Sequence, residues 1–264
     1  MNASSLPREE SMPSTPLIIG HRGASRDAPE NTLASFRLAF EQEADGIEAD
    51  FRLTRDGHIV CLHDAAAFRT AGSNLEVAAS TLAELQRLDA GIWKGDRWRG
   101  ERIPALAQVL ELLPAGKRLF IELKCGAEIL DPLAADLARA GVPADRIRFL
   151  AFDHLLVAAL KKRLPDYRTC WLCDYRWRGG WHPPAAEVLS RLAGIGADGL
   201  ASRDRAILDA SLVGELRQRG LEIHVWTVDS AKSARRLCDL GVDSIMTNRP
   251  GWLRRSLDLP RERA

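Results

Sequence analysis

The chain has 264 residues, of which 46 % are hydrophobic and 28 % are charged. This is an ordinary globular composition with ample material for a core, and the length suits a single α/β barrel. The formal net charge is only +1. So balanced a chain lacks the electrostatic field of a nucleic-acid-binding protein, and an acidic substrate would have to be bound by local cations.

The two ends of the sequence differ from the rest. Residues 1–15 are rich in Ser, Pro and Glu, and the last residues are rich in Arg. We predict a disordered tail over 1–15, a single domain over 16–253 and a second tail over 254–264. The first residues lack the apolar run of a secretory signal, no segment has the length of a membrane span, and five cysteines suit a reducing compartment. We therefore expect a cytoplasmic location and no stable membrane anchor.

The first predicted elements are a strand and a helix. The apolar run Leu17-Ile18-Ile19, stopped by Gly20, predicts the strand. Asn31 stands at the N-cap position of the helix, and apolar residues at helical spacing continue it to Glu43.

A hairpin is predicted next. Residues 46–54 and 58–63 both have the pattern of a strand, and the turn signal Asp56-Gly57 separates them. So short a connection cannot contain a crossover helix, and the two strands are therefore predicted to be antiparallel. This pairing brings His63 back beside Asp50.

The segment 64–103 interrupts the regular pattern. It contains one predicted helix, which begins at Thr81 with Glu84 in capping-box spacing. A segment of this length between barrel elements is usually an excursion or a lid. We therefore treat it as an insertion within the domain.

Regular alternation of helices and strands resumes after the insertion. The predicted helices span 104–113, 128–140, 155–164, 185–192, 212–219 and 231–240, and the predicted strands span 118–124, 147–152, 167–173, 199–201, 221–228 and 244–247. Without the return arm of the hairpin, eight strands alternate with helices, which predicts a (β/α)8 TIM barrel. An open doubly wound sheet is the alternative, but no glycine-rich phosphate loop follows the first strand.

Acidic side chains occur at the ends of predicted strands. Glu48 and Asp50 lie two residues apart and so point to the same face, and Glu122 stands near the end of another apolar strand. The active sites of such barrels lie at the carboxyl ends of the strands. Three carboxylates there are hard oxygen ligands, which predicts a site for one divalent cation, Mg²⁺ or Ca²⁺, with Mn²⁺ as a further candidate.

Cations and histidines accompany these carboxylates. Arg22 and Lys124 are suited to hold phosphate oxygens, the first as a bidentate fork and the second as a point charge. His21 and His63 suit a general base and a general acid, because imidazole titrates near neutral pH. Together these groups predict metal-assisted cleavage of a phosphodiester.

The same residues resemble the bacterial-type glycerophosphodiester phosphodiesterase family. The resemblance covers residues 17–252, and its most specific block is 21–64. The matching motifs are His21-Arg22-Gly23, Pro29-Glu30-Asn31-Thr32, Glu48-Ala49-Asp50, Thr54-Arg55-Asp56-Gly57, His63-Asp64 and Glu122-Leu123-Lys124. Looser matches extend to Trp226-Thr227-Val228 and Gly241-Val242-Asp243.

This resemblance implies a fold, a reaction and a set of roles. The family's fold is a (β/α)8 barrel, and its reaction is hydrolysis of a glycerophosphodiester, such as glycerophosphocholine or glycerophosphoethanolamine, to sn-glycerol 3-phosphate and an alcohol. The roles it implies are metal ligation by Glu48, Asp50 and Glu122, acid–base catalysis by His21 and His63, and phosphate binding by Arg22 and Lys124. Trp226 matches the family's own tryptophan and is expected to wall the substrate pocket.

Two features depart from the family pattern or lie outside it. The family often carries Thr-Asp where this chain has Thr247-Asn248, so a negative charge is missing near the mouth of the site, and we expect an effect on substrate or metal preference. Trp177 and Trp181 follow the predicted strand 167–173 and should lie on the active-site face. Their rings are expected to pack on the barrel rim, with a cage for a quaternary ammonium group as the alternative.

Three other functions compete with this interpretation. A barrel hydrolase with a histidine-rich metal centre needs an HxH motif near the first strand, where this chain has His21-Arg22-Gly23. A non-catalytic phosphate-binding relative would not need both histidines and all three carboxylates. Lysophospholipase D-type cleavage of larger lysophospholipids would use the same site, with the insertion 64–103 accommodating an acyl chain.

Overall fold

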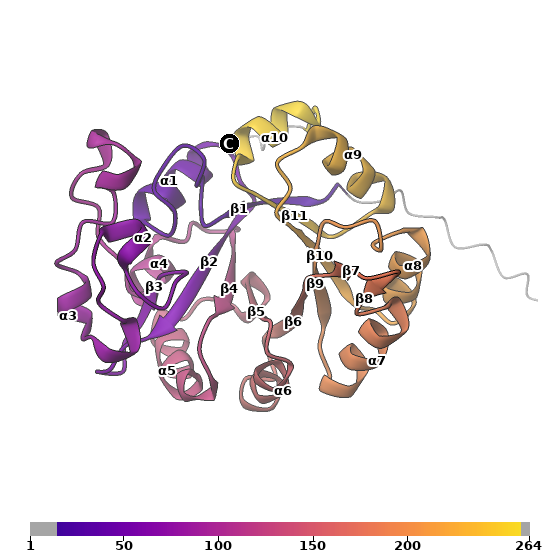
Figure 1. The fold of residues 1–264 in the computed structure, drawn as a ribbon, viewed down its shortest axis with the longest axis horizontal. Coiled ribbons are helices and arrows are strands. Elements are labelled where there is room, and N and C mark those ends of the chain that lie inside the picture. Colours follow the sequence, from indigo (N-terminus) through magenta and orange to yellow (C-terminus); the bar gives the residue numbers. More distant parts are fainter. Residues whose placement is uncertain (1–14, 260–264) are drawn as a thin grey trace, which may run out of the picture.

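A closed ring of parallel strands forms the centre of the structure, with helices around it (Figure 1). The structure is a computed structural model that describes residues 15–259. Within that range, eight parallel strands form the ring, and pairing of the first strand with both the second and the last closes it. They are β1 (Leu17–His21), β2 (Gly46–Leu53), β4 (Arg118–Leu123), β5 (Ile147–Ala151), β6 (Arg168–Cys173), β9 (Gly199–Arg203), β10 (Glu222–Trp226) and β11 (Ser244–Thr247).

The predicted (β/α)8 barrel is confirmed. The helices that cover the strands are α1 (Leu33–Glu41), α4 (Leu106–Leu112), α5 (Leu130–Ala140), α6 (His154–Arg163), α7 (Ala185–Ile195), α8 (Ala210–Gln218), α9 (Ala231–Leu240) and α10 (Pro250–Ser256). None of the helices within residues 15–259 is both long enough and apolar enough to cross a membrane.

Side chains of the barrel strands alternate between the interior of the ring and the surrounding helices. The outward-facing set packs under the helices and includes the fully buried Ile18, Ile47 and Phe149. The interior contains a separate apolar layer, made of Ile19, Phe120, Leu150, Cys170, Leu172, Ala201 and Met246. The barrel is therefore filled with side chains and is not an open pore.

The predicted hairpin is present. Strand β3 (Ile59–Cys61) pairs antiparallel with β2, with Phe51 opposite Cys61. The backbone N–H of Leu62 then donates to the carbonyl of Asp50 at 2.9 Å. His63 follows directly and so comes beside the carboxyl end of β2, as the turn signal predicted.

The insertion between β3 and α4 forms a small unit of its own at one side of the barrel (Figure 1). It contains α2 (Phe68–Ala71), α3 (Leu82–Leu85) and three 3₁₀ turns (Val77–Ala79, Ile92–Lys94 and Asp96–Trp98). The predicted helix start is confirmed, because the Thr81 side chain accepts from the backbone of Glu84 and the Glu84 side chain accepts from that of Thr81. A separate apolar cluster, including Leu62, Leu85 and Ile103, holds the insertion against the hairpin.

Several boundaries differ from the prediction, and three of them matter here. The N-cap of α1 is Thr32 and not Asn31. Strand β9 runs to Arg203, beyond its predicted end at Ala201, and α10 runs to Ser256, beyond the predicted domain end at 253. The rest of the predicted tails, residues 1–14 and 260–264, lies outside the described residues.

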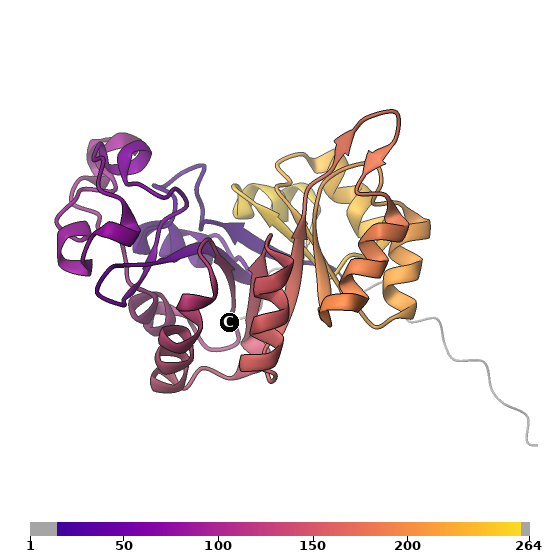
Figure 2. The same ribbon diagram turned by 60° about the horizontal axis from the view of Figure 1, so that its bottom comes forward.

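One pair of strands was not predicted. A short antiparallel hairpin, β7 (Arg176–Trp177) with β8 (Trp181–His182), follows β6 and extends beyond the barrel (Figure 2). Its arms are only two residues long, which is too short for the alternation of side chains to be recognised in a sequence.

An ion-pair network lies nearer the amino ends of the strands, on the far side of the apolar layer. Arg148 is buried and holds both carboxylate oxygens of Glu222, at 2.7 and 3.0 Å. His224 bonds Glu222 at 3.2 Å and Ser244 at 2.8 Å. Burial alone would raise the pKa of Glu222, but the hydrogen bonds from His224 and Arg148 lower it to about 2. The Cys170 thiol lies beside Glu222 and His224 in this network.

Breaking this network is expected to destabilise the fold. Arg148→Met leaves the Glu222 carboxylate inside the barrel without its main partner, which should lower the free energy of unfolding by about 3 kcal/mol. Urea denaturation followed by circular dichroism measures the change. Arg163→Met is the matched control, because its ion pair with Asp131 is exposed and should contribute less than about 1 kcal/mol. Equal losses in the two variants would contradict a structural role for the buried network.

Candidate active site

Three carboxylates converge at the carboxyl ends of β2 and β4. Glu48 and Asp50 point into the barrel from β2, and Asp50 is paired in register with Glu122 on β4. One oxygen of each lies within 4.8 Å of the other two. Their relative exposures are 1 %, 1 % and 7 %. The structure thus brings together the three residues that the sequence analysis grouped.

This arrangement fits a divalent cation. Glu48 Oε1 is buried and makes no hydrogen bond to any of the described residues. Asp50 Oδ1 and Glu122 Oε1 have the Lys124 ammonium as their one polar contact within residues 15–259. Buried carboxylate oxygens without donors are costly unless a cation binds them. Hard oxygen ligands are also those that Mg²⁺ and Ca²⁺ prefer.

The crowding of like charges shifts the ionisation of the carboxylates. Burial, Asp50 and Glu122 raise the pKa of Glu48, and burial together with Asp50 raises the pKa of Glu122 to about 7. Burial alone would also raise the pKa of Asp50, but Arg22 and Lys124 outweigh it and lower that pKa to about 2. Asp50 therefore stays charged, while the two glutamates bind protons readily until a cation compensates them.

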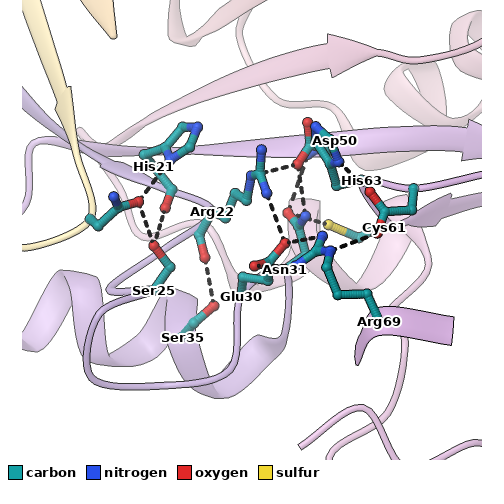
Figure 3. Close-up of polar contacts among 12 residues, drawn as sticks. His21, Arg22, Ser25, Glu30, Asn31, Ser35, Asp50, Cys61, His63 and Arg69 are labelled. Carbon is teal, nitrogen blue, oxygen red and sulfur yellow. Dashed lines mark hydrogen bonds and ion pairs between the residues drawn. The ribbon is translucent and has the colours of Figure 1, made fainter. Parts of the chain in front are cut away.

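Arg22 contacts the carboxylates from an uncommon backbone conformation. Its φ is 57°, in the left-handed region that residues with side chains rarely adopt. Its backbone N–H donates to Glu48 Oε2 at 3.0 Å, and its guanidinium lies 3.0 Å from Asp50 and 2.8 Å from Glu30 (Figure 3). Strain of this kind persists where the surrounding contacts determine it, as at functional sites. Arg22 thus serves the site with both its main chain and its side chain.

Lys124 supplies a second positive charge on the other side of the carboxylates. It follows β4, and its ammonium lies 3.2 Å from Asp50 Oδ1 and in contact with Glu122 Oε1. Its side chain is 14 % exposed, so the charge is largely screened from water by the barrel wall. Asp50 is consequently held between Lys124 and Arg22.

Asn31 belongs to the site, although the sequence analysis took it for a helix cap. It has a φ of 58°, which asparagine tolerates better than most residues. Its side-chain Nδ2 donates to Asp50 Oδ2 at 2.8 Å, and its Oδ1 accepts from the backbone N–H of Asp50 at 3.2 Å (Figure 3). The sequence did contain a sign of this role: Thr32, the next residue, can serve as the N-cap, which leaves the Asn31 side chain available for another contact.

His21 is held by a chain of side chains from the loops that follow β1, β10 and β11. Asn248 Oδ1 accepts hydrogen bonds from Ser25 Oγ and bonds His21 Nδ1, both at 2.8 Å, while Asn248 Nδ2 donates to Asp229 at 2.6 Å. This orientation of the amide places the ring proton on Nδ1 and leaves Nε2, 3.9 Å from Glu48, free of a proton. Burial and the positive charge of Arg22 lower the pKa of His21 to about 4, which also favours the neutral ring.

His63 is held in a similar way by the insertion. Its Nδ1 bonds Asp64 at 2.6 Å, and Arg69 of α2 contacts Asp64 at 2.6 Å and both oxygens of Glu30 at 2.8 Å (Figure 3). Glu30 in turn contacts Arg22. A continuous set of ion pairs therefore connects His63 to the guanidinium of Arg22.

A cavity of about 300 Å³ is lined by six of these groups: His21, Arg22, Glu48, His63, Glu122 and Lys124. Trp226 lies in the wall of this cavity. Its ring nitrogen donates to the Ala201 carbonyl at 2.9 Å, and its ring makes a T-shaped contact with that of Phe152 at a centroid distance of 5.6 Å. The cavity wall also includes Asp174 and Arg203, which the sequence analysis did not single out.

Trp177 and Trp181 lie outside this cavity. Their rings pack edge to face, with centroids 5.3 Å apart, and Trp177 is 65 % exposed. Trp181 packs at the edge of the main core. Trp181 therefore packs against the barrel, whereas Trp177 is largely exposed and contacts Trp181.

Comparisons with known proteins agree with this geometry. The family model described as "Glycerophosphoryl diester phosphodiesterase family" matches residues 21–252. The chain belongs to this family. Among curated relatives, a glycerophosphodiester phosphodiesterase from Caldanaerobacter subterraneus subsp. tengcongensis is 34 % identical over 243 residues, covering 90 % of this chain and 96 % of the relative. The resemblance found from the motifs is therefore correct, and the chain is a phosphodiester-cleaving enzyme of this family.

Solved structures of family members share the fold. A phosphodiesterase from Oleispira antarctica, solved in complex with the product sn-glycerol-3-phosphate, has a TM-score of 0.81 at 28 % identity and covers 92 % of this chain and 97 % of its own. A glycerophosphodiester phosphodiesterase from Agrobacterium tumefaciens has a TM-score of 0.78 at 29 % identity and covers 90 % and 98 %. These two family members thus share the barrel fold described here.

Metal affinity of this phosphodiesterase is expected to rise with pH. Without a metal the pKa of Glu122 is raised to about 7, so below that pH a cation must displace a proton in order to bind. The dissociation constant for Mg²⁺ or Ca²⁺ should therefore fall by about tenfold or more per pH unit below pH 7, because Glu48, whose pKa is also raised, can hold a second proton. Isothermal titration calorimetry between pH 5.5 and 8 measures this, and a dissociation constant that does not vary over the range would contradict the assignment.

Proposed function

We propose that this enzyme catalyses metal-dependent hydrolysis of glycerophosphodiesters, such as glycerophosphocholine or glycerophosphoethanolamine, to sn-glycerol 3-phosphate and an alcohol. The observation that carries the proposal is the convergence of buried carboxylates, two cations and two oriented histidines on one cavity. Each is a group that phosphodiester cleavage needs. The product bound in the Oleispira antarctica relative is sn-glycerol-3-phosphate, which supports the same substrate class.

Glu48, Asp50 and Glu122 are the proposed ligands of one divalent cation, Mg²⁺ or Ca²⁺, with Mn²⁺ as a further candidate. The absence of sulfur and imidazole from this group supports a hard cation over zinc. Such a cation, when bound, neutralises a phosphate oxygen and stabilises the charge that develops in the transition state.

Arg22, Lys124 and Trp226 are the proposed substrate-binding residues. Arg22 and Lys124 approach the carboxylate cluster from two sides, so a phosphate above it would meet a positive charge on each flank. Trp226 lies in the cavity wall beyond Lys124 and offers an apolar surface to the carbon atoms of the substrate.

His21 is the proposed general base and His63 the proposed general acid. The neutral His21 presents an unprotonated Nε2 to the cavity and can accept the proton of the attacking oxygen, which belongs to water or to the substrate's own glycerol hydroxyl; the second route forms a cyclic phosphate that water then hydrolyses to sn-glycerol 3-phosphate. The bond from that oxygen to phosphorus forms as the bond to the alcohol oxygen breaks. His63, on the other side of Arg22 and Asp50 (Figure 3), can then protonate the departing alkoxide.

A cytoplasmic location is part of this proposal. The five cysteines are all free and include three that are buried, which suits a reducing compartment. Lysophospholipids are the competing class of substrate.

Metal dependence and ligand assignment are tested together. With Mg²⁺ or Ca²⁺ present, the enzyme should release glycerol 3-phosphate from glycerophosphocholine, and chelator should abolish release. Glu122→Gln should lower kcat/KM by at least about 100-fold, because it removes one charged ligand. Glu128→Gln is the matched control, since Glu128 lies exposed in the turn after the same strand and should leave the rate unchanged.

The outcome that would overturn the substrate assignment is equally concrete. Release of choline from lysophosphatidylcholine, with no release of glycerol 3-phosphate from any glycerophosphodiester, would indicate a lysophospholipase D. Metal-loaded, folded protein with neither activity would indicate a binding protein that has kept the fold.

The two histidines are distinguished by the leaving group. His21→Ala and His63→Ala should each lower kcat on glycerophosphocholine by about 10²- to 10⁴-fold. With a p-nitrophenyl ester, whose leaving group needs no proton, His63→Ala should recover most of its rate and His21→Ala should not. His154→Asn, at the start of α6 and outside the cavity, is the control. Recovery of His21→Ala instead would exchange the two roles.

A further inference from the structure

Asp174 and Arg203 face the carboxylate cluster across the same cavity. They occupy equivalent places on neighbouring strands, because Asp174 follows Cys173, which is paired with Ser202, and Arg203 follows Ser202. Arg203 is itself paired in register with Trp226 on β10. An acid, a base and an aromatic ring thus come together from three adjacent strands at the end of the cavity away from the proposed metal ligands.

The two charged side chains have hydrogen-bonding capacity left for a ligand. Arg203 and Asp174 are 3.8 Å apart at their nearest nitrogen and oxygen, and each side chain is 42 % exposed. At that distance they attract each other without a hydrogen bond. Asp174 Oδ1 accepts from the backbone N–H of Tyr175 at 2.8 Å, while Oδ2 and the Arg203 guanidinium make no hydrogen bond within residues 15–259. A donor and an acceptor therefore stand side by side in the wall.

The aromatic surfaces beside this pair are already occupied by the protein's own cations. The Arg203 guanidinium lies 5.1 Å from the centre of the Trp226 ring, and the Lys124 ammonium lies 5.7 Å from that of Phe152. A quaternary ammonium group would have to displace them, since it competes for the same ring faces. A second anion would meet the Asp174 carboxylate. The chemistry that fits is neutral, with one acceptor and one donor close together.

We propose that Arg203 and Asp174 bind a vicinal diol of the substrate, and that Arg203 is a specificity-determining residue. One hydroxyl accepts from the Arg203 guanidinium, its neighbour donates to Asp174 Oδ2, and the carbon chain lies against Leu172 at the base of the cavity. This inference rests on the proposed function. The diol has two sources, either the glycerol unit common to all glycerophosphodiesters or a polyhydroxylated alcohol such as inositol.

The chain provides a matched control for Arg203. Arg205 also contacts Asp174, at 3.7 Å, and its side chain is 39 % exposed, but it does not line the cavity. Arg203→Gln and Arg205→Gln therefore remove equally long ion pairs from the same carboxylate, and only the first removes a donor from the cavity. Both variants should keep the thermal unfolding midpoint of the wild type.

The substrates are glycerophosphocholine, glycerophosphoinositol and propylphosphocholine, which lacks the diol. If the glycerol unit is the ligand, Arg203→Gln lowers kcat/KM by about 10- to 100-fold on the first two and less than threefold on the third. If the alcohol is the ligand, only glycerophosphoinositol shows that loss. Arg205→Gln stays within threefold of wild type on all three. Either pattern supports recognition of a diol.

Two results would overturn the proposal. One is an Arg203→Gln variant that matches Arg205→Gln on every substrate, and the other is an equal loss on propylphosphocholine, which would assign Arg203 to the phosphate. Should the wild type cleave none of these esters, the proposed function fails separately. Calorimetric binding to the metal-loaded protein then decides, because wild type should prefer sn-glycerol 3-phosphate to propyl phosphate by about tenfold or more and Arg203→Gln should bind both equally.

Discussion

The mutual repulsion of three buried carboxylates is the constraint on which the active site depends. Glu48, Asp50 and Glu122 are almost completely removed from water and lie within 4.8 Å of one another. Such a cluster is unfavourable unless positive charge compensates it. Arg22 and Lys124 provide part of the compensation, and they stabilise chiefly Asp50. The two glutamates remain incompletely neutralised, so the fold leaves an electrostatic requirement that a divalent cation can satisfy.

The barrel holds this concentration of charge on rigid strands, and ion pairs from residues around the cluster support it. Glu30 holds Arg22, and Arg69 holds Glu30 together with Asp64, which orients His63. Arg69 belongs to α2 in the insertion. The insertion between β3 and α4 is therefore connected to the proposed catalytic groups by ion pairs. Its own small apolar core also holds it against the hairpin.

Much of this arrangement could be predicted from the sequence, because two rules act together. Strand alternation places Glu48 beside Asp50 on one face, and the barrel fold directs the carboxyl ends of all strands to one mouth. The (β/α)8 fold, the hairpin and the gathering of the proposed ligands, cations and histidines at one mouth of the barrel follow from these rules. The metal, the catalytic roles and the location are still predictions, since they concern chemistry and not placement.

What could not be predicted depends on side-chain contacts between distant segments. Asn31 is a residue type that is common at helix N-caps, and its left-handed backbone conformation is what turns the side-chain amide toward Asp50. Asn248 was expected to affect substrate or metal preference, and that stays a prediction. Its side-chain contacts with His21, Ser25 and Asp229 join segments from nearly 20 to more than 200 residues apart in the chain, so the sequence alone could not show them. Arg203 was missed because β9 was predicted to end at Ala201, two residues too early for alternation to place Arg203 inside.

The ion pair between Arg148 and Glu222 affects how substrate and products enter and leave the barrel. Together with the apolar layer above it, this pair closes the barrel on the side opposite the active site. Substrate and both products must therefore share one opening of the barrel. In the proposed reaction the alcohol departs first, while the phosphorylated product, retained by Arg22 and Lys124, departs last and competes with the next substrate molecule for the vacated cavity.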